Sequence, residues 1–219
     1  MNVFYLHNDP WQCAREHCDK HVVKMVIEYA QLLSTAHRIV DGVEYEGRTQ
    51  TGRRVRRWTL PDPSDEAVVY KASHINHPSA VWARKNDKNY IWLLELWYAL
   101  SYEYEHRYGR EHLTFTKLKD VLNRVPTNMP EGEFSDPPPA MPDYCKRPDS
   151  VESYKFYYIN EKKRFAKWTN RPIPKWFDSE SEQCPPMFSK TQTQMKSGKK
   201  VVPLLSAMDS STPIPTLQQ

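Results

Sequence analysis

Residues 10–40, PWQCAREHCDKHVVKMVIEYAQLLSTAHRIV, decide the fold. Asp9 followed by Pro10 is typical of a helix N-terminus, where an acidic cap precedes a first-turn proline. Apolar side chains then recur every three or four residues and cover well over half of the helix circumference. We therefore expect one helix from Pro10 to about Val40, ended by Asp41-Gly42. A helix with so wide an apolar surface belongs at the centre of a mainly α-helical fold.

The same helix carries a polar stripe. Lys24 and Glu28 are one turn apart, Gln31 follows on the next turn, and Lys20 precedes them. A lysine beside a carboxylate can act as a Schiff-base nucleophile, and a partly desolvated glutamate can act as a general base. The Lys-to-Glu order is the weaker one for helix stability. The stripe is interpreted either as a solvated face or as one wall of a site.

A second long helix is expected from Pro78, within NHPSAVW (76–82), to Tyr108, with Gly109 as its C-terminal glycine. His77 stands directly before the proline. The helix dipole disfavours a charged histidine at this end, so a neutral His77 can accept a proton. The alternative is that His77 only caps or packs the helix.

Other candidates for substrate binding surround His77. Asn76 precedes it, and Arg84 on the helix can reach a phosphate that the helix N-terminus would also favour. Asn89 follows on the same helix. Trp82 is either a core residue or a stacking surface for a substrate.

Residues 42–60 predict a β-hairpin around a Thr51-Gly52 turn. Arginines are concentrated in it, namely Arg48, Arg53, Arg54, Arg56 and Arg57. Because we expect little acidic charge nearby to neutralise them, we interpret this basic hairpin as a DNA-phosphate contact.

The rest of the chain completes a compact helical bundle of two long helices and a third, C-terminal helix. We expect short helices at 67–73 and 117–122, a proline-rich extended connector at 126–148, and the third helix from Asp149 or Ser150 to Arg171-Pro172. Residues 1–177 are thus one helical domain, and residues 178–219, rich in Ser, Thr, Gln, Lys and Pro, are expected to be a flexible tail.

Composition limits the class of protein. The 219 residues carry a net charge of +4 with 12% aromatic residues, which permits a nucleic-acid partner without requiring one. No secretory signal or apolar run long enough for a membrane span is present. Four cysteines are too few for a disulfide scaffold. These features indicate a protein of a reducing cytoplasm, that of the bacterial host if the chain is phage-encoded, without membrane association.

The stretch CAREHCDKH invites a metal interpretation, because Cys13, His17 and His21 are spaced by single helical turns. A zinc site needs three protein ligands for catalysis and four for structure, and no CxxC or HExxH pattern supplies the rest. We therefore expect neither a metal nor another cofactor.

Three blocks of the sequence together resemble a family. CDKHVVKMVIEYAQLL (18–33), NHPSAVWARKNDKNYIWLLELWYAL (76–100) and YKFYYINEKKRFAKWTNRPIPKWF (154–177) are similar to small phage and bacterial proteins. Those proteins are grouped with the pyrimidine-dimer DNA glycosylases of the endonuclease V type. The matching positions are Asp19, Lys20, Lys24, Glu28 and Gln31 in the first block and Asn76, His77, Pro78 and Trp82 in the second.

The resemblance implies a compact, helical, metal-free enzyme that acts on damaged or modified pyrimidines in duplex DNA, with the target base flipped out. In that family an N-terminal α-amine attacks the sugar C1′ with help from a glutamate, and the strand is cleaved through a Schiff base. Glu28 corresponds to that glutamate, and His77 would face it. This chain begins Met1-Asn2, and so bulky a second residue should leave Met1 in place. The nucleophile is then the Met1 amine, Lys24 or absent, and Lys24 is our choice.

Two other functions fit the same sequence. One is a phage enzyme that modifies nucleotides or DNA bases on the same scaffold. The other is a non-enzymatic factor that binds DNA or a protein, such as an inhibitor of host defence. The sequence fixes neither the target base nor the oligomeric state.

Overall fold

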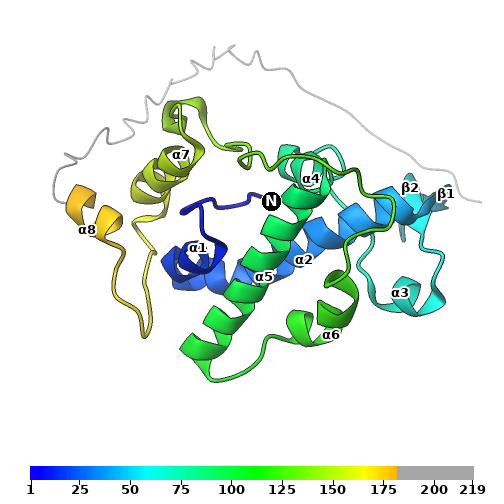
Figure 1. Cartoon of the computed structure of the whole chain (residues 1–219), viewed down its shortest axis with the longest axis horizontal. Coiled ribbons are helices and arrows are strands. Elements are labelled where there is room, and N and C mark those ends of the chain that lie inside the picture. The colour runs from blue at the N-terminus through cyan, green and yellow to red at the C-terminus, as the bar shows by residue number, and fades with distance from the viewer. Residues whose placement is uncertain (182–219) are drawn as a thin grey trace, which may run out of the picture. The chain divides into compact units, whose positions relative to one another are not determined.

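The computed structural model describes residues 1–181, with side chains to residue 178 (Figure 1). The described chain is mainly helical and contains a two-stranded antiparallel hairpin, which confirms these two parts of the expected fold. The helices are α1 (Pro10–Glu16), α2 (Asp19–Asp41), α3 (Pro63–Val68), α4 (Pro78–Ala83), α5 (Asp87–Tyr108), α6 (Leu113–Leu122), α7 (Ser150–Tyr157) and α8 (Lys175–Ser181). A 3-10 turn, η1 (Asp143–Cys145), precedes α7, and a π-helical segment, η2 (Tyr158–Lys162), follows it.

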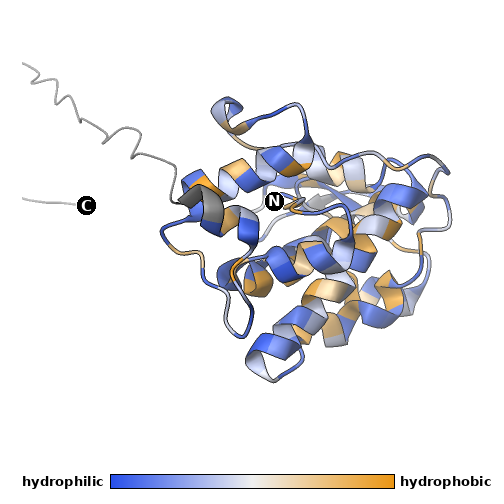
Figure 2. Cartoon of the chain, turned by 60° about the vertical axis from the view of Figure 1, so that its left-hand side comes forward, coloured by the Kyte–Doolittle hydropathy of each residue, from blue (hydrophilic) through white to orange (hydrophobic). Residues whose placement is uncertain are grey.

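The core forms where α2 packs on α5, with α1 against the same face of α5. Figure 2 shows hydrophobic and hydrophilic residues alternating along these helices. Leu32 and Leu33 of α2 and Leu93 and Leu96 of α5 are fully buried. Trp97 joins the two helices by a hydrogen bond as well, because its indole Nε1 donates to the Val26 carbonyl at 2.9 Å. The position of α2 is therefore fixed along its length.

The prediction of a single helix from Pro10 to Val40 is wrong. The backbone is extended at His17 and Cys18, and this break separates α1 from α2. Tertiary contacts hold the break. The backbone N–H of Asp19 donates to the Lys167 carbonyl at 2.8 Å, and the Asp19 carboxylate accepts from the backbone and hydroxyl of Thr169. Partners from the far end of the chain thus replace the helical hydrogen bonds lost at the break.

The second long helix is also interrupted. Asn86 is extended and divides it into α4 and α5. The Asn86 side chain accepts from the backbone of Asn89 as an N-cap and donates to the Glu133 carbonyl at 2.9 Å. The connector that supplies Glu133 therefore stabilises the break. The expected C-terminal end is confirmed, since Gly109 has φ +67.

The hairpin is confirmed, with β1 (Val43–Arg48) paired to β2 (Arg54–Thr59) and Gly52 at φ +80 in the turn. The expected short helix at 67–73 is displaced to α3, because Asp62 caps the chain at Pro63. The helix expected at 117–122 starts earlier, at Leu113.

The proline-rich connector contains a turn at 127–128 and η1, and the rest of it has no helix or strand. The helix expected from Asp149 to Arg171 is shorter, since α7 continues only through η2 to Lys162. The expected tail overlaps α8, which runs to Ser181, and otherwise lies outside the described residues. Within residues 1–181, no helix is both long and apolar enough to cross a membrane.

Candidate functional site

The carboxylate of Glu28 lies between two amines. Lys24 Nζ is 2.9 Å from Oε1, and the α-amine of Met1 is 4.0 Å from Oε2. The Lys24 side chain is 67% exposed, whereas that of Glu28 is 16% exposed. The amine of Lys24 is thus open to a substrate, while the carboxylate is largely shielded. An amine beside a shielded carboxylate is an arrangement suited to covalent catalysis.

The N-terminal segment is placed beside Glu28 by the core. Residues 3–6 are buried, and the backbone N–H of Phe4 donates to the Tyr29 hydroxyl at 3.1 Å. The Phe4 ring stacks on His21 with centroids 4.1 Å apart. Because Tyr29 directly follows Glu28 on α2, the segment that carries the α-amine is attached next to the carboxylate. The role of Tyr29 has no separate sequence signal.

His77 is the N-cap of α4, and its Nδ1 accepts from the backbone N–H of Ser79 at 3.2 Å. Burial lowers the pKa of His77, and the positive charges of the α-amine and of His74 lower it further, while Glu28 opposes them. The turn before it is unusual, since His74 has φ +50. A neutral ring whose Nδ1 accepts carries its proton on Nε2. His77 therefore offers an N–H donor, and the charges of Met1 and Glu28 both act on it.

The remaining predicted residues of the α2 stripe and of the α4 turn are accessible. Lys20 and Asn76 are exposed, and Gln31 is half-buried. Lys20 Nζ lies 4.8 Å from the centroid of the Phe165 ring. The structure thus leaves these three side chains available to a ligand.

Arg84 has an unfilled donor. Its Nη2 donates to the Ile75 carbonyl at 2.7 Å, but its buried Nη1 has no hydrogen-bond partner among the described residues. Burial lowers the pKa of Arg84. A buried donor without a partner is costly, and because Nη1 is itself buried, an anion can reach it only if the side chain moves.

Trp82 and Asn89 have structural roles. Trp82 is 5% exposed, and its Nε1 donates to the Ser135 carbonyl at 2.7 Å. Asn89 is fully buried and exchanges hydrogen bonds with Ser135 and the Trp82 carbonyl. Together they attach the connector to α4 and α5. Their assignment to substrate binding stays a prediction, and the contacts that the structure shows for them are core contacts.

Acidic residues neutralise part of the hairpin, contrary to expectation. Arg56 forms a two-armed ion pair with Glu44, with both contacts at 2.6 Å, and Arg54 Nε lies 3.4 Å from Glu46. The glutamates are on β1, on the same face as their partners across the hairpin. Arg48 donates to the Gly52 carbonyl, and Arg53 and Arg57 form no ion pair with the described residues. Fewer than the five predicted arginines are thus free for phosphates.

The histidines of the metal-like stretch are engaged in hydrogen bonds. His17 Nδ1 lies 2.7 Å from the Cys13 carbonyl oxygen, and its Nε2 lies 3.0 Å from the Tyr29 hydroxyl. His21 Nδ1 bonds to the Tyr158 hydroxyl. Among the described residues, no three His, Cys, Asp or Glu side chains are placed to hold a metal ion.

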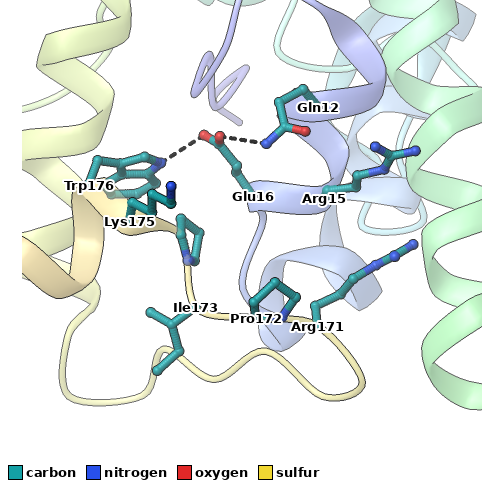
Figure 3. Close-up of a pocket in the computed structure, with 9 residues that line it drawn as sticks. Gln12, Arg15, Glu16, Arg171, Pro172, Ile173, Lys175 and Trp176 are labelled. Carbon is teal, nitrogen blue, oxygen red and sulfur yellow. Dashed lines mark hydrogen bonds between the residues drawn. The ribbon is translucent and has the colours of Figure 1, made fainter.

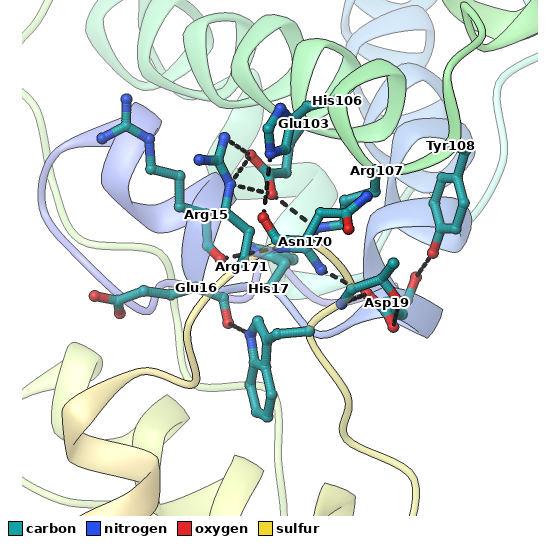
Figure 4. A network of polar contacts seen from close by, with 12 residues as sticks. Arg15, Glu16, His17, Asp19, Glu103, His106, Arg107, Tyr108, Asn170 and Arg171 are labelled. Atoms are coloured by element: carbon teal, nitrogen blue, oxygen red, sulfur yellow. Dashed lines mark hydrogen bonds and ion pairs between the residues drawn. The ribbon is translucent and has the colours of Figure 1, made fainter.

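A polar network orients the start of α2 (Figure 4). Glu103 is 3% exposed and accepts from Arg107 Nε at 2.7 Å and from Arg171 Nη2 at 2.8 Å. Arg107 also pairs with Asp19 at 2.9 Å. Burial by itself would raise the pKa of Glu103, but the hydrogen bonds and charges of the two arginines lower it. The network fixes the direction in which the following turns of α2 present Lys24 and its neighbours.

A cavity of about 490 Å³ lies between α1 and residues 171–176 (Figure 3). The buried Glu16 carboxylate accepts from Gln12 Nε2 at 2.9 Å and from Trp176 Nε1 at 2.8 Å. None of the predicted site residues lines it. The arrangement around Glu28 is thus distinct from this cavity.

Comparison of the chain with protein-family models, with curated proteins and with solved structures gives no match.

Proposed function

We propose that the chain acts on DNA bases as a glycosylase with AP-lyase activity, directed at damaged or modified pyrimidines. The observation that carries this proposal is the Glu28 carboxylate between two amines, 2.9 Å from Lys24 and 4.0 Å from the α-amine of Met1. A carboxylate with an adjacent amine nucleophile is what Schiff-base chemistry at a sugar carbon needs. The motif resemblance implies the same residue as the catalytic glutamate.

The proposed reaction uses Glu28 twice. A neutral amine, for which Lys24 is our choice, forms a bond to the sugar C1′ while the bond from C1′ to the base breaks and its electron pair leaves on the base. The base takes up a proton. Glu28 takes a proton from the attached amine and passes it to O4′, as the nitrogen lone pair forms the C1′–N double bond and the C1′–O4′ bond breaks, which opens the sugar to an iminium ion. Glu28 then removes a C2′ proton, and the resulting β-elimination expels the 3′ phosphate.

His77 and Arg84 would assist through their free donors. The Nε2–H of a neutral His77 can donate to the departing base, where negative charge develops. Arg84 Nη1, buried and unpaired among the described residues, can donate to a phosphate oxygen once its side chain moves toward the surface. Lys20, Gln31 and Asn76 stay candidates for substrate contact because their side chains are accessible.

Borohydride trapping tests the proposal directly. The protein is mixed with duplex DNA that contains an abasic site or a thymine dimer, and borohydride reduces any imine to a stable covalent complex. We expect an adduct with the wild-type chain and strong loss of it in Glu28→Gln. Glu95→Gln is the matched control, because Glu95 is an exposed glutamate on α5.

The result that contradicts the proposal is the absence of an adduct on both substrates from a protein that binds the same DNA. That result would reject the imine and favour base modification or binding without catalysis.

A further inference from the structure

Cations of α2 and of the segment after α7 meet on one surface, which we call the basic rim: Lys20, Lys24, Lys162 and Arg164. The ring of Phe165 joins two of them, with Lys20 Nζ 4.8 Å and Arg164 Cζ 5.8 Å from its centroid. Lys162 Nζ lies 4.3 Å from the centroid of the Tyr157 ring. The rim thus combines residues about 140 positions apart in the chain.

The aromatic core under the rim connects it to Glu28. Phe4 stacks on His21 and on Tyr157, with centroids 4.1 and 6.3 Å apart. The His21 ring also contacts the Phe165 ring of the rim, with centroids 5.9 Å apart. Since Lys24 also pairs with Glu28, the rim begins at the proposed reaction centre.

Ion pairs with carboxylates leave most of the positive charge of the rim unneutralised. Among the described residues, Lys24 alone of the four has a carboxylate within 4.0 Å. Lys20 and Arg164 are exposed, and Lys162 is half-buried with its amine 3.0 Å from the Tyr157 hydroxyl. In the hairpin, by contrast, Glu44 and Glu46 pair with two of the five arginines.

Distance from Glu28 also favours the rim over the hairpin. α2 extends 13 residues beyond Glu28 to Asp41, about 20 Å along the helix axis at the standard rise, and the hairpin begins only after that, at Val43. The rim is therefore the basic surface beside the reaction centre.

We propose that the basic rim binds the sugar-phosphate backbone of the nucleic acid on either side of the reacting nucleotide, and that the hairpin arginines contribute less. This inference rests on the proposed function for its choice of polyanion. Phe165 and Tyr157 hold the cations in place through their rings, so that the amines are ordered before the phosphates arrive.

Binding of a fluorescent duplex with a non-cleavable abasic analogue tests the rim without requiring catalysis. Fluorescence anisotropy is measured between about 50 and 200 mM salt. The rim variant is Lys20→Gln, Lys162→Gln and Arg164→Gln combined. The hairpin control is Arg48→Gln, Arg53→Gln and Arg57→Gln, which removes the same number of charges from arginines without an ion pair to described residues.

We expect the rim variant to lose about 10-fold or more in affinity and to lower the salt slope by about two to three, since each phosphate contact contributes about 0.9. The hairpin control should keep most of the affinity and most of the salt slope. Replacement of Lys20 and Lys162 by arginine should preserve binding, which separates charge from folding. If the triple variant fails to fold, Lys20→Gln alone, at an exposed position, should still lower the slope by about one.

Equal affinity of the rim variant and the wild type, or a larger loss of affinity in the hairpin control, would contradict the proposal that the rim binds the sugar-phosphate backbone. Rim-dependent binding without any borohydride adduct would support the rim and reject the proposed chemistry. A wild-type chain that does not bind the duplex would reject both.

Discussion

His17 Nε2 and the Tyr29 hydroxyl lie 3.0 Å apart, and this contact completes a directed chain of hydrogen bonds. The Cys13 carbonyl can only accept, so His17 carries its proton on Nδ1 and its Nε2 accepts from Tyr29. The Tyr29 oxygen in turn accepts from the backbone N–H of Phe4. One buried hydroxyl thus joins α1, α2 and the N-terminal segment, and thereby places the α-amine.

Replacement of this hydroxyl should destabilise the fold. We expect Tyr29→Phe to lower the free energy of unfolding by about 1–3 kcal/mol, because it leaves the Phe4 N–H and His17 Nε2 buried without partners. Urea denaturation measures the change. Tyr45→Phe on the exposed hairpin is the control, expected within about 0.5 kcal/mol of wild type. Equal stability of the two variants would contradict the hydrogen-bond chain.

Acid should weaken the fold through three buried histidines. Burial is the main cause that lowers the pKa of His17 and His37 to about 4 and that of His21 to about 2. Below about pH 6.5 the unfolded chain takes up protons that the folded chain refuses, so unfolding becomes easier as pH falls. The stabilising contribution is complete above that pH and is lost progressively down to about pH 4 for His17 and His37.

Each of these groups should cost roughly 1 kcal/mol per pH unit within its window. Urea denaturation between about pH 7 and pH 5 measures the slope. His37→Gln should give a shallower slope than wild type, whereas His106→Gln, at an exposed position, should not. An unchanged slope in the His37 variant would show that this ring takes up its proton as readily in the folded chain as in the unfolded chain.

The Glu103 network should be sensitive to the loss of one charge. Glu103→Gln leaves Arg107, whose side chain is fully buried, without its nearest carboxylate. We expect a loss of roughly 3 kcal/mol in unfolding free energy, typical of breaking a buried ion pair. Thermal or urea unfolding measures it, with Glu105→Gln on the exposed face of α5 as the control. A loss no larger than that of the control would mean that water already screens the network.

The identity of the nucleophile can be decided by removing each amine separately. We expect Lys24→Met to abolish the borohydride adduct, since Lys24 is the accessible amine at Glu28. Acetylation of the α-amine should leave the adduct in place. DNA binding, measured in parallel, is the control for loss of a phosphate contact. The reverse pattern, with the adduct lost on acetylation and kept in Lys24→Met, would assign the attack to the α-amine.

Local patterns in the sequence predict which helices and strands form better than they predict where a helix is interrupted. The cap at Asp149, the glycine at 109 and the hairpin turn follow from short-range chemistry, and each is present. The two helix breaks could not be predicted, because residues far away in the chain stabilise them. Thr169 binds the start of α2, and Glu133 binds the cap of α5.

The candidate site shows the same limit. One-turn spacing predicts the Lys24–Glu28 pair correctly, since the distance depends on the helix alone. The charges of the α-amine and Glu28 act on His77 only because α4 packs on α2. Cross-strand pairing with Glu44 likewise determines how much of the Arg56 charge is available. Long-range packing therefore decides which charged residues are available.

The junction between α1 and α2 can be fixed only late in translation. Its partners, Lys167 and Thr169, are made some 150 residues after α1. At 5–20 residues per second, about 8 to 30 s pass before the ribosome has added them. During that interval the two helices can already pack on α5, but they lack the contacts that fix their junction. A nascent chain stopped short of residue 169 would stay in that state.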